Sequence, residues 1–91
     1  MTGLFKFRIR GQLRAGPLRR LCNEPYAGCV HLLEYQSLDL TSYGDEAVLP
    51  NLCLVVGVHT YSEEEALHLA DRVGVELCPD EFLLERMSNE G

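Results

Sequence analysis

The basic side chains near the N-terminus have the types and spacing that most directly suggest a chemistry. Three basic residues alternate with three large apolar residues: Lys6, Arg8 and Arg10 against Phe5, Phe7 and Ile9. Successive side chains of a strand point to opposite faces, so this alternation predicts one basic and one apolar row. We interpret the basic row, together with Arg14, as a candidate surface for binding an anionic partner. The alternative is a solvated strand face whose charges keep the sheet soluble.

The distribution of charge argues against a nucleic-acid partner. Residues 1–20 hold six basic and no acidic side chains, whereas the remaining residues hold two basic and all fourteen acidic ones. The net charge of −6 repels nucleic acid at long range, although a local basic patch can still engage phosphates. A sheet platform for single-stranded RNA needs aromatic rings on its basic face, and here Phe5 and Phe7 point away from it.

Residue types that could support catalysis or bind metal are present without the spacing that either chemistry needs. They are Cys22, Cys29, Cys53, Cys78, His31, His59 and His68. Cys29 and His31 share one strand face, but no C-x-x-C or H-x-x-x-H pair occurs and no local context marks a nucleophile. Glu63 to Glu65 are explained by a helix N-terminus, where carboxylates are favourable. We expect no enzyme activity, catalytic residue, cofactor or metal, and we expect reduced cysteines.

Hydrophobic periodicity predicts the strands that position these residues. Alternation over 4–13 and 28–36 predicts strands with one buried face, and the apolar run 51–60 predicts a central strand covered on both sides. Residues 75–78 are expected to form a short fourth strand. The connection 37–50 shows only turn signals, and a connection of this length in a small domain is often functional or mobile.

Start and stop signals predict the helices. Pro17 suits the first turn of a short helix that Pro25 stops. Ser62 and Glu65 form a capping box for a helix over residues 62–73, with Gly74 as the glycine that ends it. Asp80 is expected to cap a last helix that runs to about Met87.

This order of elements predicts an α+β fold of the ferredoxin-like βαββαβ type. It is a four-stranded antiparallel sheet with two helices on one face, plus the C-terminal helix. The first and third strands would be central. The exposed sheet face would carry the basic row beside one of two rows of the third strand: either Cys53, Val55, Gly57 and His59, or Leu52, Leu54, Val56 and Val58.

The stretch FRIRGQLRAGPLRRL resembles the opening of ACT domains, which are ferredoxin-like regulatory modules. Residues 14–18 are similar to the family's R-P-G-x-L loop, with the glycine and leucine in step and the proline displaced. The acidic residue common at the end of the first strand is replaced by Gln12 and Leu13. The resemblance covers residues 4–78. It implies an amino acid or small anionic ligand at a dimer interface, with Arg14 and Gly16 as ligand-binding residues.

Length and composition predict a single domain over 1–91 with a frayed tail at 88–91. No apolar run approaches the roughly 18 residues that span a bilayer, and no signal-peptide pattern opens the chain, so we expect a cytoplasmic protein with no membrane contact. We predict a non-catalytic regulatory or protein-binding module that acts through protein–protein contacts, as an inhibitor or homodimer. The alternative is an ACT-like sensor of a small anionic ligand or amino acid.

Overall fold

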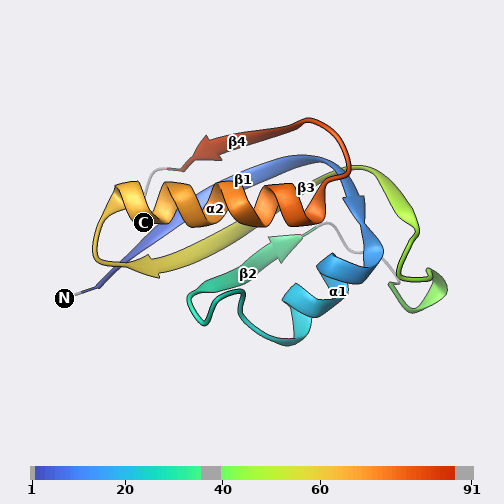
Figure 1. Ribbon diagram of the computed structural model, residues 1–91, viewed down its shortest axis with the longest axis horizontal. Helices are drawn as coiled ribbons and strands as arrows, with labels where there is room; N and C mark the ends of the chain where they lie inside the picture. The colour runs from blue at the N-terminus through green and yellow to red at the C-terminus, as the bar shows by residue number, and fades with distance from the viewer. Residues whose placement is uncertain (1, 36–39, 88–91) are drawn as a thin grey trace.

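The chain folds into a four-stranded antiparallel sheet with two α-helices on one of its faces (Figure 1). The computed structural model describes residues 2–35 and 40–87. The tail 88–91, predicted to be frayed, and part of the connection 37–50 lie outside the described residues. The α+β class and the antiparallel sheet agree with the prediction from sequence.

The elements follow one another along the chain with one short 3-10 turn among them. They are β1 (Gly3–Arg14), α1 (Ala15–Asn23), β2 (Val30–Tyr35), η1 (Leu40–Ser42), β3 (Val48–Thr60), α2 (Glu63–Leu77) and β4 (Phe82–Arg86). Among the described residues, neither α-helix has the length and apolar character that crossing a membrane requires.

The two long strands β1 and β3 occupy the centre of the sheet, as the sequence predicted. The order is β2-β3-β1-β4, and each neighbouring pair is antiparallel. Phe7 lies opposite Val56 and Ile9 opposite Leu54, and these four side chains are buried against the helices. Directly opposed residues share a face of a sheet. The other face therefore carries Lys6, Arg8 and Arg10.

The hydrophobic core lies between the sheet and the helices. Phe7, Ile9 and Val58 from the sheet are fully buried against Leu18 of α1 and Ala70 of α2. Burial of each large side chain contributes roughly 1.5–3 kcal/mol to folding. The apolar row of β1 therefore anchors both helices to the sheet, whereas its basic row is left for solvent or a partner.

Helix α2 begins where the sequence predicted and ends later. The Ser62 hydroxyl accepts a hydrogen bond from the backbone N–H of Glu65 (3.2 Å), which confirms the cap. The predicted end at Gly74 is wrong, because the helix continues to Leu77 and the Cys78 N–H bonds to the Gly74 carbonyl. The strand predicted at Val75–Cys78 is therefore wrong as well. Val75 is 61% exposed and does not make the apolar contact that a glycine ending would need.

The predicted C-terminal helix over residues 80–87 is also wrong, because Phe82–Arg86 forms β4. This strand pairs with β1, and the Met87 N–H continues the pairing by donating to the Lys6 carbonyl (2.9 Å). Leu83 is 61% exposed while Phe82 and Leu84 pack against the core, which is the alternation of a strand. A segment of this length gains more by hydrogen bonding to the free edge of β1 than by forming an isolated helix of about two turns.

Gly74 is explained by a close contact between α2 and β4. A methyl group at this position would overlap the ring of Phe82. Glycine inside a helix costs about 0.5–1 kcal/mol relative to alanine, and here its small size lets the aromatic ring approach the helix backbone. The glycine therefore fixes the distance between α2 and the last strand.

We expect Gly74→Ala to lower the free energy of unfolding by about 1–3 kcal/mol, because overpacking outweighs the gain in helix propensity. Urea denaturation measures the change. Gly44→Ala is the matched control, since a Cβ at Gly44 would meet no atom within 4 Å. In a Phe82→Leu background the penalty at Gly74 should shrink or reverse. An equal effect of Gly74→Ala with and without the Phe82 ring would rule out this contact as the cause.

Candidate functional site

The sheet face opposite the helices, here called the open face, carries the predicted basic row. Lys6 lies opposite Gly57, Arg8 opposite Val55 and Arg10 opposite Cys53. The register thus selects the first of the two rows of β3 that the sequence left open. Arg10 is exposed, and Lys6 and Arg8 are partly exposed. The strand pairing brings together three of the predicted partner-binding residues.

Leucine side chains lie beside the basic row on the open face. A Cβ placed on Gly57 would lie 3.0 Å from Cδ1 of both Leu4 and Leu33, so these leucines from β1 and β2 approach each other over the glycine. Leu4 is 37% exposed and Leu33 43% exposed, and Leu83 on β4 is 61% exposed at the other end of the row. The open face therefore combines cationic groups with accessible aliphatic surface.

The electrostatics of this face differ from those of the whole chain. Among residues 2–35 and 40–87, the open face carries three basic side chains and two acidic ones, Glu34 and Glu85, which is a balance of +1 in a chain of net charge −6. Arg8 and Glu85 approach to 3.7 Å with both side chains partly exposed, and such pairs contribute little. Within the described residues, Lys6 and Arg10 form no ion pair. Their charges are therefore available to an anionic group.

Two histidines also lie at this surface. The rings of His31 and His59 pack edge to face with centroids 5.4 Å apart and an interplanar angle of 86°. In the part of the chain that the structure describes, no three His, Cys, Asp or Glu side chains are grouped so that they could hold a metal ion. The histidine pair adds a polar aromatic surface to the apolar end of the open face.

Arg14 lies apart from the other basic residues. Its guanidinium NH1 donates to the backbone carbonyl of Glu76 at 3.4 Å, near the C-terminal end of α2. Positive charge is favourable there, because the last carbonyls of a helix carry partial negative charge. The structure thus places Arg14 at a helix terminus rather than in one surface with Lys6, Arg8 and Arg10.

Gly16, predicted to bind a ligand, lies against the chain's own β2–β3 connection. Its backbone N–H donates to the Asp45 carbonyl (3.1 Å), and the N–H of Ala15 donates to the Ala47 carbonyl (2.9 Å). A Cβ on Gly16 would lie 2.9 Å from the Asp45 carbonyl oxygen, so the glycine permits this close approach. The backbone N–H groups of Ala15 and Gly16 therefore already donate hydrogen bonds within the chain.

Arg19 fastens the same connection to α1. Its NH2 donates to the carbonyls of Leu40 and Tyr43, both at 2.6 Å, and its NH1 pairs with the Asp45 carboxylate. One guanidinium fork thus closes the turn at residues 40–45. The described part of the connection, predicted to be functional or mobile, is anchored to α1 by these bonds.

The four cysteines are free thiols that lie at different depths. Cys22 is exposed, Cys29 and Cys53 are half-buried, and Cys78 is buried. Burial raises the pKa of the Cys78 thiol, and the charge of Arg14 only partly opposes this shift. A raised pKa reduces the thiolate fraction, so Cys78 has the character of a core side chain rather than of an activated nucleophile.

Comparison with protein-family models, with curated proteins and with solved structures finds no match for this chain. The chemistry of the site therefore has to be argued from its own geometry. That geometry offers cationic and aliphatic groups on one uncovered sheet face. Sequence analysis missed the leucines of this face. The exposed sides of the predicted strands could have indicated Leu4 and Leu33, whereas Leu83 lay in a segment that was predicted to be helical.

We expect Arg19→Ala to release the turn at residues 40–47 from α1. The carbonyls of Leu40 and Tyr43 and the carboxylate of Asp45 would all lose the guanidinium group that binds them. Hydrogen exchange should accelerate at the amides of Tyr43 and Ala47, and stability should fall by on the order of 1–2 kcal/mol. Arg19→Lys keeps the positive charge but loses the branched guanidinium group, so it should restore only part of the lost stability. Arg20→Ala is the neighbouring control. Unchanged exchange in Arg19→Ala would show that the turn holds without the arginine.

We expect the four thiols to react with iodoacetamide in the native protein in the order of their exposure, with Cys22 first and Cys78 last. The raised pKa of Cys78 adds to its steric protection, so a rise in pH should increase its modification. Peptide mass spectrometry resolves the four sites. Rapid modification of Cys78, or an intact mass four hydrogens light, would contradict this expectation.

Proposed function

We propose that the protein is a non-catalytic protein-binding module that docks an acidic partner protein on the open face of its sheet. The observation that carries the proposal is the row Lys6, Arg8 and Arg10 on the one sheet face that neither helix covers. Basic groups placed beside exposed leucines suit a partner that offers carboxylates and aliphatic side chains together. Regulation or inhibition of that partner is the role we assign to the contact.

We infer that the domain is ferredoxin-like in its finer topology. The support is the sheet order β2-β3-β1-β4 together with two crossovers, α1 between β1 and β2 and α2 between β3 and β4. Both helices then pack on the same face and leave the other free. The fold supports many functions, so the functional argument rests on the surface rather than on the topology.

The basic row favours an acidic partner over a second copy of the chain. A symmetric contact between two open faces would bring two basic rows together, which is unfavourable where like charges lose solvent. A contact between the open face and the acidic remainder of another copy would be heterologous and would not close into a dimer. We therefore assign the surface to a different protein and place the interaction in the cytoplasm.

We expect the double variant Lys6→Thr/Arg10→Thr to lose the partner that the wild-type protein captures from its host. With the purified partner, the association rate at low salt should fall about tenfold and depend less on salt, because steering charges act mainly on association. Stopped-flow or surface plasmon resonance measures the rate. Threonine suits a strand, so the sheet should remain folded.

The matched control is Arg20→Ala/Arg72→Ala, which removes the same charge from the helices. This control should keep the partner and its association rate. Equal loss in both double variants would show an effect of net charge alone and would contradict a site on the open face. Size-exclusion chromatography with mass detection is the second measurement. If the wild type dimerises and the Lys6→Thr/Arg10→Thr variant does not, the open face binds a second copy of the chain instead of a different protein.

A further inference from the structure

Strand β4 is an edge of the sheet with unpaired backbone groups on its outer side. It pairs with β1 alone, and among the described residues no strand lies beyond it (Figure 1). The Met87 N–H donates to the Lys6 carbonyl, and in an antiparallel pair every second residue bonds to the same neighbour. Leu84 lies an odd number of residues before Met87, so its N–H and C=O point toward the free edge, as do those of Phe82 and Arg86.

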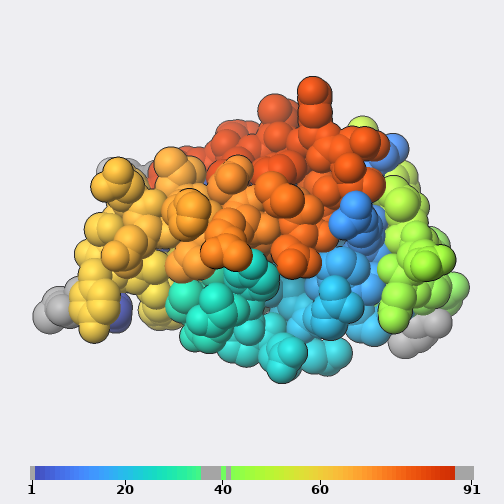
Figure 2. All heavy atoms as spheres, in the orientation of Figure 1, coloured from blue at the N-terminus to red at the C-terminus, as the bar shows by residue number. Residues whose placement is uncertain are grey.

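The flank of α2 beside β4 is hollowed, and we call this region the edge groove. A hollow of about 380 Å³ is lined by Leu84 of β4 and by Glu64, Leu67, His68 and Asp71 of α2. Residues three and four apart lie on one side of a helix, so these α2 side chains form one row. A second, shallow hollow of about 820 Å³ shares Asp71 and Leu84 and continues past the start of β4. Figure 2 shows the surfaces of α2 and β4 meeting along this margin of the molecule.

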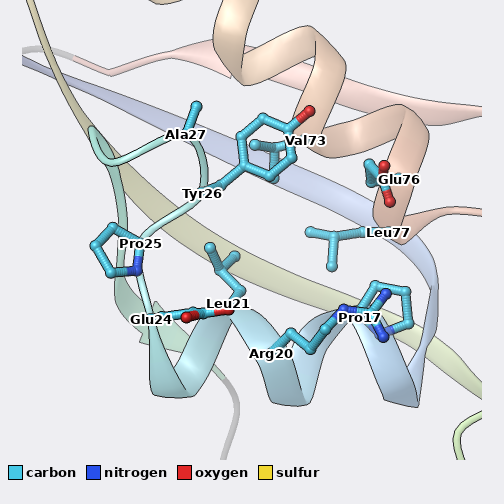
Figure 3. A pocket seen from close by; sticks show the side chains of 10 residues that line it. All are labelled: Pro17, Arg20, Leu21, Glu24, Pro25, Tyr26, Ala27, Val73, Glu76 and Leu77. Atoms are coloured by element: carbon cyan, nitrogen blue, oxygen red, sulfur yellow. The ribbon is translucent and has the colours of Figure 1, made fainter.

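The opposite flank of α2 is already used by the fold. Val73 and Leu77 point toward Leu21 of α1 across a cleft of about 300 Å³ (Figure 3), and all three side chains are almost completely buried. In the edge groove, by contrast, Leu67 is 49% exposed, and Leu83, on the open-face side of β4, is 61% exposed. The apolar surface that remains accessible beside α2 therefore lies on its β4 flank.

The edge groove is acidic. Its two hollows are lined by one arginine, Arg10, and by four exposed carboxylates: Glu64, Asp71, Asp80 and Glu81. In the part of the chain that the structure describes, none of these four acids forms an ion pair. Carboxylates around aliphatic carbon suit a lysine or arginine side chain, whose stem packs on apolar atoms while its charge reaches the rim. A symmetric contact with a second copy would bring like charges together here, which is unfavourable.

We propose that the edge groove binds an extended basic segment of a partner protein, which adds to β4 as a fifth strand. Edge strands accept such segments through main-chain hydrogen bonds, and side-chain pockets supply the selectivity. In antiparallel pairing, the residue that bonds to Leu84 directs its side chain to the helix side of the sheet. Basic residues at this and every second position would cover Leu67 and reach Glu64 and Asp71. The intervening positions would place aliphatic side chains beside Leu83.

This site goes beyond the open face, to which we assign an acidic partner. The two surfaces overlap only at Leu83 and Arg10, and they attract charges of opposite sign. The variant Lys6→Thr/Arg10→Thr should therefore not weaken binding of the basic segment. Failure of one proposal can thus be distinguished from failure of the other.

The probe is the peptide acetyl-KVKVKVK-amide, whose alternation places lysines on one side of a strand and valines on the other. Its titration into the 15N-labelled full chain should shift the amide signals of β4 and of residues 64–71 and leave those of β2, the other edge strand, unchanged. Exchange of the Leu84 amide hydrogen should slow, since this N–H gains a partner. No shifts at millimolar peptide, or shifts at β2 in place of β4, would overturn the proposal. Shifts at β4 that depend on protein concentration alone would make a second copy the occupant and overturn it as well.

N-methylation of the peptide backbone tests the hydrogen bonds themselves. Methyl groups on the backbone nitrogens of the lysines remove the N–H groups that face β4 and should weaken binding at least about tenfold. The same groups on the valines point away from β4 and should be tolerated. Both peptides carry the same charge, so equal affinity of the two, whether strong or weak, would contradict strand addition.

Variants of the rim test the charges. Glu64→Gln/Asp71→Asn should weaken the peptide about tenfold at low salt and less at high salt, because salt screens exposed charges. Glu24→Gln/Glu76→Gln removes the same charge from the cleft on the other flank of α2 and is the matched control. This control should bind the peptide like the wild type. Equal weakening in both double variants would show an effect of net charge alone and would contradict the assigned contacts.

Discussion

The antiparallel pairing of β1 with β3 is the interaction on which the rest of the structure depends. These two strands are the longest in the sheet and pair along nearly their whole length. β2 adds to the outer edge of β3, β4 adds to the outer edge of β1, and both helices pack on the apolar row that the pair presents. A one-residue slip in this register would turn the apolar row toward solvent and the basic row toward the helices.

The same register determines which side chains lie on each of the two sides of the sheet. On the helix side it yields a continuous core, at whose margin α1 and α2 leave the cleft. On the open side it aligns the basic groups of β1 with Gly57, Val55 and Cys53 of β3. Leucines from the strands on either side of β3 then approach each other over Gly57. Two surfaces of different character thus follow from one strand pairing.

Local signals in the sequence were sufficient for part of this structure. Strict alternation predicted β1, and the Ser62 cap predicted the start of α2, because each depends on residues close together in the chain. Gly74 was misinterpreted since its role depends on the ring of Phe82, which belongs to the next element along the chain. The missed strand β4 was taken for a helix because only the free edge of β1 makes it a strand. The anchor at Arg19 and the cleft were beyond prediction because each joins segments far apart in the sequence.

The strand pairing also has a consequence for synthesis on the ribosome. β1 is complete by Arg14, but its partner β3 begins only at Val48, so more than thirty further residues must be made before the ladder can form. At roughly 5–20 residues per second, this leaves Phe5, Phe7 and Ile9 without their core for a few seconds. An exposed apolar strand is prone to aggregate, and interleaved charges oppose edge-to-edge association. The charges of Lys6, Arg8 and Arg10 therefore oppose association of nascent chains while the apolar row of β1 is still uncovered.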